Sequence, residues 1–313
     1  MRRIQEGRLT SDDDWQAEFT TALANAGLAP LTVRTYRHNV ALFLAWLGEV
    51  RGGTTKLSDL CAAEVLSYRQ HLVSVARLRA PTINQRLQAI RWLGRWAEHH
   101  GLLKSSPVVE VKSLPVPKRL RPVGLTEPEV HSLLRLAGES KREGKRNYAL
   151  LQLLLQTGLQ VGELASLRVA DVTIRERSGE VRTHRGAGSK EREVPLNASG
   201  RRALRAYLKS RPEAQADDSL FLSNRGRVLS PRALQTLLQR LARRAKITRL
   251  RVTPLRLRHT FALNYLQQNP GKLVDLANLM GHESLDTTAV YTEPSGAEEL
   301  AKNLERSRLN VHG

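Results

Sequence analysis

The sequence has only one cysteine, Cys61, among its 313 residues. A single thiol cannot form an intrachain disulfide, and it excludes a metal cluster built from several thiolates. Cys61 begins an apolar helical stretch, so we expect it in the core. No apolar run reaches the roughly eighteen residues that a membrane-spanning helix needs. The first residues, Met1 to Glu6, lack the apolar segment of a secretory signal, and we therefore expect a cytoplasmic protein.

Acidic side chains are scarce relative to basic ones. The chain carries 50 Lys and Arg against 30 Asp and Glu, which gives a formal net charge of +20. This excess favours nucleic acid as a partner, because cationic side chains release the counterions condensed on it. A soluble protein that is merely basic is the alternative. RNA is disfavoured, since the short predicted strands carry none of the aromatics on which bases stack in RNA-binding sheets.

Residues 1–112 predict a compact helical domain. Apolar residues recur at helical spacing in four segments, whose starts are marked by Ser11, Thr32, Ser58 and Pro81. Three cations, Arg34, Arg37 and Arg86, lie near helix starts, where side chains and backbone N–H groups can grip phosphates. They could equally belong to a solvated face.

Residues 113–124 predict a linker between two domains. This segment holds three prolines, three cations and no acidic residue. The prolines exclude a regular helix or a central strand. An extended basic strap of this kind suits a protein that wraps around a duplex.

Residues 125–313 predict a mainly α domain with a small antiparallel β-sheet. Short strands are expected at 169–176, 180–183 and 193–196, among helices that include 147–156, 199–210, 232–246 and 297–306. Near the end, a helix stops at Gly281, and a short helix begins near Ser284 and carries Tyr291. Short polar side chains suit that helix start.

Four stretches of this second part resemble the tyrosine recombinase (phage integrase, Xer-like) family, in the order and spacing of that family. They are Thr157-Gly-Leu-Gln-Val-Gly-Glu-Leu164, Gly186-Ala-Gly-Ser-Lys-Glu-Arg-Glu-Val-Pro-Leu196, Thr253-Pro-Leu-Arg-Leu-Arg-His-Thr-Phe-Ala262 and Leu279-Met-Gly-His282 through to Tyr291-Thr292. The resemblance implies a helical core-binding (SAM-like) domain at 1–112 and a catalytic domain at 125–313. It also implies that the two form a C-shaped clamp on DNA.

The resemblance implies site-specific DNA recombination or integration through a 3′-phosphotyrosine. Tyr291 would attack the scissile phosphate, and Arg258 would clamp its non-bridging oxygens. His282 would donate to the same phosphate, and Lys190 would protonate the leaving oxygen. Neither a metal nor another cofactor is implied. Structural roles stay open: Lys190 as a turn residue, His282 as a helix cap and Arg258 as a surface cation.

Two positions depart from the family pattern. Gln160 stands where the family places an arginine after Thr-Gly-Leu, and Leu255 stands where it usually places a histidine after Thr-Pro. Losing one preorganised donor at such a transition state costs on the order of 3–4 kcal/mol. The alternative function is therefore a catalytically impaired relative that acts as a sequence-specific or architectural DNA-binding protein. Arg256 is a weak substitute for the missing histidine, and His259 is expected to pack or cap.

Double-stranded DNA is the expected partner. The helix 232–246 is our candidate for the major groove; it bears Arg240, Arg243, Arg244 and Lys246, of which we expect Arg243 and Arg244 to reach the DNA. A basic solvated face is the alternative for this helix. The resemblance also implies that helix 297–306 docks on a neighbouring protomer and builds a homotetramer on DNA, which would associate the protein with the nucleoid.

Overall fold

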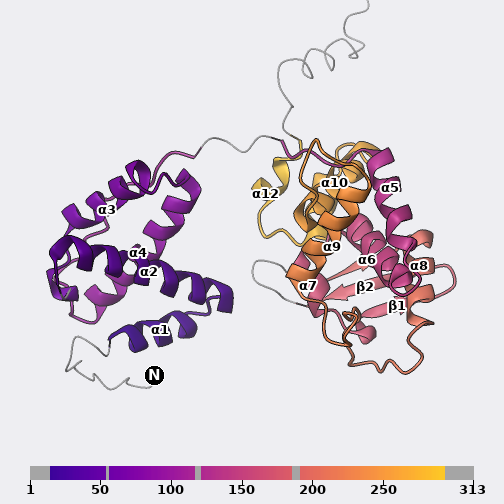
Figure 1. Cartoon of the computed structure of the whole chain (residues 1–313), viewed down its shortest axis with the longest axis horizontal. Helices are drawn as coiled ribbons and strands as arrows, with labels where there is room; N and C mark the ends of the chain where they lie inside the picture. Colours follow the sequence, from indigo (N-terminus) through magenta and orange to yellow (C-terminus); the bar gives the residue numbers. More distant parts are fainter. Residues whose placement is uncertain (1–14, 54–55, 117–120, 185–190, 293–313) are drawn as a thin grey trace, which may run out of the picture. The chain divides into compact units, whose positions relative to one another are not determined.

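The computed structural model describes residues 15–53, 56–116, 121–184 and 191–292. The chain divides into two compact units, Met1–Lys118 and Arg119–Gly313 (Figure 1). The expected class, mainly α with a small antiparallel sheet, is confirmed. Lys190 and the expected terminal helix 297–306 lie outside the described residues.

Helices make up the described part of the first unit, together with one short 3-10 turn. These elements are α1 (Trp15–Asn25), α2 (Pro30–Arg51), η1 (Leu57–Asp59), α3 (Ala62–Ser74) and α4 (Ala80–His99). The apolar faces expected from helical spacing are buried. Trp15 and Phe19 of α1 pack on Trp96 of α4, with ring centroids 6.3 and 5.5 Å from that of Trp96. Their burial stabilises the unit through apolar area removed from water.

The chain that follows α4 runs back along this helix. The side-chain amide of Asn84 exchanges two hydrogen bonds with the backbone of Leu114, at 2.9 and 2.8 Å. Arg91 Nη2 donates to the carbonyl of Val111 at 2.7 Å. The packed first unit therefore extends at least to residue 114.

Cys61 is exposed, so its expected place in the core is wrong. It is the N-cap residue of α3, and its backbone N–H donates to Glu64 Oε2 at 3.1 Å. The N-cap residue lies just before the first helical turn of α3. Its side chain is therefore not part of the buried face of that helix and is exposed to solvent.

The second unit is organised around one apolar helix. Its helices are α5 (Glu127–Gly138), α6 (Gly144–Thr157), α7 (Val161–Ser166), α8 (Ala198–Leu208), α9 (Pro231–Arg244), α10 (Pro254–Gln268), α11 (Leu273–Met280) and α12 (Leu285–Ala289). In α6, Leu150, Leu151, Leu153 and Leu154 have no exposed surface. α5, α8 and α10 pack against this helix. A helix that is apolar on all sides is stable only when its neighbours cover it in this way.

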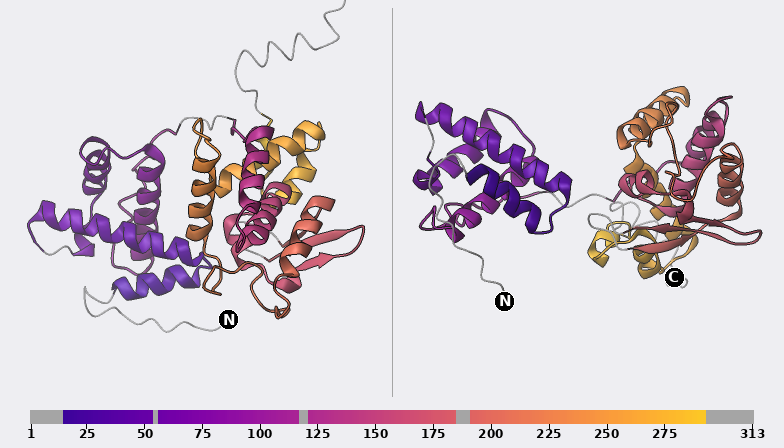
Figure 2. Two further views of the ribbon diagram at one scale, coloured as in Figure 1. Left: turned by 45° about the vertical axis from the view of Figure 1, so that its right-hand side comes forward. Right: turned by 90° about the horizontal axis from the view of Figure 1, so that it is seen from below.

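Three antiparallel strands form the sheet, in the order β1 (Val172–Ile174), β2 (Gly179–Thr183) and β3 (Arg192–Pro195). α8 lies beside this sheet (Figure 2), and its Arg201 packs against Gly179. The expected strand 169–176 is wrong in its first three residues. They form a 3-10 turn, η2, because the Asp171 carboxylate accepts a hydrogen bond from the Arg168 backbone N–H at 2.7 Å.

Two glycines end the helices α6 and α11 in the left-handed conformation. Gly158 has φ +61° and Gly281 has φ +69°. Each also lies against a side chain: a Cβ at Gly158 would overlap the ring of Phe261, and one at Gly281 would come within 2.6 Å of Arg192 Nη1. These ends are therefore fixed both by backbone conformation and by close packing.

Gly158→Ala is expected to lower the free energy of unfolding of the second unit by about 2–5 kcal/mol. The left-handed backbone costs a residue with a Cβ about 1–2 kcal/mol, and the overlap with Phe261 adds about 1–3 kcal/mol. Urea denaturation followed by circular dichroism measures the loss. The matched control is Gly226→Ala, because Gly226 has φ +71° but nothing within 4 Å of its Cβ position. Equal losses in the two variants would contradict the packing argument.

Candidate active site

A cleft of about 1020 Å³ lies in the second unit, where the starts of α7 and α10 meet the segment around α12. Its lining includes Gln160, Leu255, Arg258, His282 and Tyr291. The fold therefore brings together three of the four motif stretches. The fourth predicted catalytic residue, Lys190, lies outside the described residues.

Arg258 is the buried cation of the cleft. Only 6% of its surface is exposed. Nη1 donates to the carbonyl of Gly158 at 2.5 Å, and Nη2 donates to the carbonyl of Met280 at 2.9 Å. These carbonyls end α6 and α11, and such helix ends carry partial negative charge. Burial lowers the pKa of Arg258, and the nearby carboxylate of Glu163 opposes that shift. The alternative of an ordinary surface cation is thus wrong.

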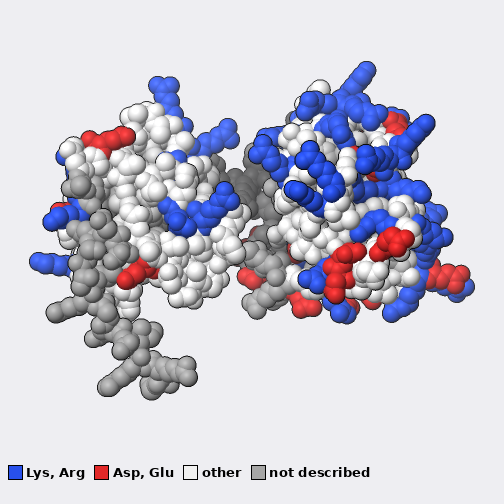
Figure 3. Space-filling model, turned by 60° about the horizontal axis from the view of Figure 1, so that its bottom comes forward, with Lys and Arg blue, Asp and Glu red and all other residues white. Residues whose placement is uncertain are grey.

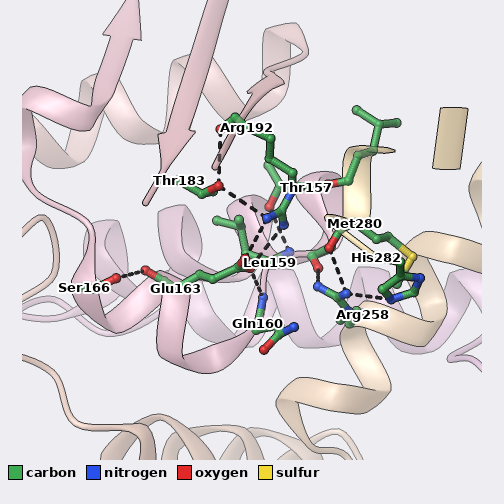
Figure 4. A network of polar contacts seen from close by, with 12 residues as sticks. Thr157, Leu159, Gln160, Glu163, Ser166, Thr183, Arg192, Arg258, Met280 and His282 are labelled. Atoms are coloured by element: carbon green, nitrogen blue, oxygen red, sulfur yellow. Dashed lines mark hydrogen bonds and ion pairs between the residues drawn. The ribbon is translucent and has the colours of Figure 1, made fainter. Parts of the chain in front are cut away.

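His282 is neutral in this arrangement. Burial lowers its pKa to about 4, and the cations Arg258 and Arg192 add to the shift. Nε2 lies 2.8 Å from Nη2 of Arg258 (Figure 4), and Nδ1 lies 2.7 Å from the Thr288 hydroxyl. Because a guanidinium can only donate, Nε2 accepts and Nδ1 carries the ring proton. The ring therefore offers a phosphate no N–H at Nε2 until Arg258 turns to another acceptor.

Tyr291 lies two residues beyond the end of α12, so the expectation that this helix carries it is wrong. Its backbone N–H donates to the carbonyl of Thr288 at 3.0 Å. The side chain is 4% exposed, and its hydroxyl lies 2.8 Å from Nδ1 of His259. Burial raises the pKa of the phenol, and the cation of Arg258 opposes that shift. The phenol thus faces the same cleft as Arg258 and His282.

A buried ion pair supports the cleft from behind. Arg192 of β3 donates from Nη1 and Nη2 to the two carboxylate oxygens of Glu163, at 2.6 and 3.1 Å (Figure 4). Arg192 Nε also donates to the carbonyl of Leu279 at 2.6 Å. Glu163 accepts a further hydrogen bond from the Gln160 backbone N–H at 2.7 Å. The pair therefore fixes β3, the start of α7 and the end of α11 relative to one another.

Sequence analysis missed Glu163 and Arg192, and it expected His259 only to pack or cap, whereas this histidine lines the cleft beside Tyr291. A signal for Arg192 was present, because it stands two residues before the buried Val194 in a strand and so points to the same face. A cation on a buried strand face requires a partner. Glu163 and His259 gave no comparable signal, since helical spacing alone does not identify a contact between distant segments.

The two departing positions both reach the cleft. Gln160 is the N-cap residue of α7, and its side chain lines the cleft. Leu255 lies in the first turn of α10 with 59% of its surface exposed. The cleft therefore has an uncharged amide and an apolar side chain where the family pattern has a cation and an imidazole.

The predicted DNA-binding cations occupy several surroundings. At the end of α9, Arg240 and Arg244 form exposed ion pairs with Glu143 and Glu139, at 3.4 and 2.6 Å. Such exposed pairs contribute little stability. The remaining cations are Arg243 and Lys246, which are exposed at the end of the same helix; Arg34 and Arg37, which border a groove between α1 and α2; and Arg86, whose Nη1 lies 3.4 Å from the Tyr68 hydroxyl.

Lys and Arg side chains spread over the face of the second unit that Figure 3 shows, while Asp and Glu form smaller groups there. Among the described residues, no group of three or more His, Cys, Asp or Glu is placed to hold a metal ion. In the same residues, no helix is both long and apolar enough to cross a membrane.

Family models match both units. Residues 124–298 match the phage integrase family, and residues 15–100 match the phage integrase N-terminal SAM-like domain. The tyrosine recombinase XerC of Myxococcus xanthus is 35% identical over 275 residues, which cover 85% of this chain and 88% of that protein. The tyrosine recombinase XerD of Ralstonia nicotianae is 30% identical over 270 residues, which cover 85% of this chain and 84% of that protein.

Solved structures share the fold. The site-specific recombinase XerH, bound to a palindromic difH substrate in a post-cleavage complex, matches with a TM-score of 0.74 and 20% identity. That match covers 95% of this chain and 85% of the XerH chain. With the family match over more than half of the sequence and relatives at 30% identity or above, this chain belongs to the phage integrase family of tyrosine recombinases.

Proposed function

We propose that this chain cuts and rejoins double-stranded DNA at specific sites through a 3′-phosphotyrosine formed on Tyr291. The observation that carries this proposal is the convergence of Tyr291, Arg258 and His282 on one cleft. A nucleophile, a buried cation and an imidazole in one place can stabilise and attack a phosphodiester. The bond energy stays in the link between enzyme and DNA, so the reaction needs no nucleotide cofactor.

Each residue has a role that its contacts support. The guanidinium of Arg258 is oriented by two fixed carbonyls, which leaves it preorganised to bind the non-bridging oxygens of the phosphate. The phosphate would take over the Arg258 group that now meets His282. His282 could then carry its proton on Nε2, with the Thr288 hydroxyl donating to Nδ1 in return. Lys190 remains our proposed acid for the leaving 5′ oxygen.

Tyr291→Phe is expected to abolish covalent attachment to a suicide DNA substrate with a nick near the crossover. The variant lacks the attacking oxygen but keeps the aromatic ring, so affinity for the same DNA should stay unchanged. Denaturing gel electrophoresis measures the adduct, and a mobility-shift assay measures binding. An adduct that persists in the variant would contradict the role of Tyr291, and its absence from the unaltered protein at any enzyme level would count against catalysis.

A second candidate function is favoured by Gln160 and Leu255. Without the family's cation and imidazole, the chain could bind, bend or bridge DNA with little cleavage of its own. Both residues line the cleft, so these two positions offer a phosphate neither a cation nor an imidazole. The two functions differ in whether the cleft responds to a restored cation.

Gln160→Arg is expected to raise the single-turnover rate of adduct formation about 10²-fold, since one preorganised donor is worth about 10²–10³ in rate. Adding Leu255→His should raise it further. Gln160→Met is the matched control, because it keeps the chain length but removes the amide donor, and the rate should fall. If Gln160→Arg leaves the rate of adduct formation unchanged while the unaltered protein already cleaves DNA, the hypothesis of a catalytically impaired relative is wrong.

The first turn of α9 is our proposed contact for the major groove. Val161 borders both the cleft and a shallow apolar depression beside Ser230 and Pro231, which open α9. The end of α9 instead carries Arg244, paired with Glu139 of α5. Exposed Arg232 in the first turn, with Arg225 and Arg227 in the preceding loop, would therefore meet DNA closer to the cleft than Arg243 at the other end of the helix.

Arg232→Ala is expected to weaken binding to the specific site about tenfold, and Arg243→Ala to weaken it less. The two substitutions remove the same group from opposite ends of one helix, so each serves as the control for the other. Mobility-shift titrations on specific and unrelated DNA, at one fixed salt concentration, measure both effects. A larger loss of affinity for the specific site in Arg243→Ala would indicate that the end of α9, and not its first turn, contacts the major groove.

The proposal extends to the whole chain. The helical unit and the catalytic unit would close on opposite faces of the duplex, joined by the basic segment 113–124. Terminal segment 297–306 would link neighbouring protomers into a homotetramer on DNA. Such a complex would place the protein in the cytoplasm, on the nucleoid.

A further inference from the structure

His259 lies beside the proposed nucleophile. It follows Arg258 in α10, and one helical step turns its side chain about 100° away from that of Arg258. Its Nδ1 lies 2.8 Å from the Tyr291 hydroxyl, and the two rings meet edge to face with centroids 5.6 Å apart. Among the described residues, His259 is the one hydrogen-bonding partner of the phenol. The contact joins an imidazole directly to the oxygen that must attack.

We propose that His259 is the catalytic residue that takes the proton from the Tyr291 hydroxyl as it attacks DNA, and returns that proton when the strand is rejoined. This inference rests on the proposed function, because it assigns one step of the same reaction. The imidazole with its proton on Nε2 leaves Nδ1 as an acceptor, which suits a phenol that donates.

The step balances in atoms and electrons. A lone pair on the phenol oxygen forms the new bond to phosphorus while the O–H bond breaks and its proton moves to Nδ1. The electron pair of the phosphorus–O5′ bond leaves with the 5′ oxygen, which takes a proton from the acid assigned to Lys190. In rejoining, the 5′ hydroxyl attacks the phosphotyrosine and gives its proton to the now neutral amine assigned to Lys190, while the departing phenol oxygen recovers its proton from the imidazolium. No further reactant is needed.

The phenol needs such an acceptor. Burial raises its pKa, so it is protonated near neutral pH and is a weak nucleophile. Arg258 cannot accept a proton. The ring nitrogens of His282 already face Arg258 and Thr288. His259 is left as the group in direct contact.

The position of His259 also accounts for Leu255. The two residues are four apart on α10, so they lie on the same face one turn from each other. Both line the cleft. Leu255 has no proton acceptor where the family pattern has an imidazole. His259 supplies an imidazole to the same cleft from the next turn of the same helix.

Charged groups around His259 set how firmly it holds the proton. The titratable groups that share the cleft with it are Arg121, Arg256, Arg258, His282, Glu283 and Tyr291. The three arginines disfavour an imidazolium, whereas Glu283 and a bound DNA phosphate favour it. In the proposed reaction, a bound phosphate would help Nδ1 to accept the proton and the arginines would help to return it, as a reversible strand transfer requires.

The test measures the single-turnover rate of adduct formation on the nicked substrate from pH 6 to pH 9.5, at saturating DNA. In the unaltered protein the rate should rise as His259 loses its proton and then level off. His259→Ala should be slower by about 10²–10⁴-fold near neutral pH, the usual contribution of a general base. The rate of this variant should keep rising with pH, because hydroxide then removes the phenol proton. The difference in rate between the variant and the unaltered protein should therefore become smaller at high pH.

His259→Asn separates proton transfer from positioning. The amide can occupy the place of Nδ1 and keep a hydrogen bond to the phenol, but it cannot take up a proton at these pH values. It should therefore share the slow rate and the steep pH dependence of His259→Ala. Leu255→His placed on His259→Ala should recover part of the rate, because it returns an imidazole to the same face. Retained affinity for the nicked DNA shows that a variant is folded. If His259→Ala loses this affinity, the rate and pH profile of His259→Asn test the role of His259 instead.

Three results would overturn the role of His259. They are an unchanged rate in His259→Ala, a loss by the same factor at every pH, and a normal rate and profile in His259→Asn. Each of these occurs while the unaltered protein still forms the adduct, so the proposed function would survive. An unaltered protein that forms no adduct at any pH would overturn the proposed function and this role together.

Discussion

The buried guanidinium of Arg258 is the constraint on which the site depends. Two helices end on it, since the carbonyls of Gly158 and Met280 accept its hydrogen bonds at 2.5 and 2.9 Å. Orphan carbonyls at helix ends need donors, and a buried cation needs acceptors, so each satisfies the other. The cation is therefore held in one place, and in the proposed reaction this preorganisation would let it stabilise the charge that develops on the phosphate.

A second buried cation keeps that arrangement together. Arg192 pairs with Glu163 and also binds the carbonyl of Leu279, one residue before Met280. The side chain of Arg192 therefore joins β3 to the helix end that faces Arg258. Removing either member of such a pair leaves an uncompensated buried charge. The glycine at 281 is explained by the same contact, because a Cβ there would meet Arg192.

The cleft that contains Tyr291 holds two histidines in different surroundings. His282 has a pKa of about 4 because burial and two arginines disfavour its charged form. It therefore serves as a neutral hydrogen-bonding group. His259 contacts the phenol itself. With Gln160 and Leu255 uncharged, the proposed chemistry would depend on these histidines and on Arg258 more heavily than the family pattern implies.

The sequence determined the elements and the family. Apolar spacing in α4 and the dense cluster of leucines in α6 are local, so both helices and their buried faces followed from the chain itself. The motif stretches likewise identified Tyr291, Arg258 and His282. Only the tertiary structure decided which groups touch. Arg258 is bonded across 100 residues to Gly158, and His259 across 32 to Tyr291. Contacts at such separations depend on how helices pack, and helical periodicity does not encode that packing.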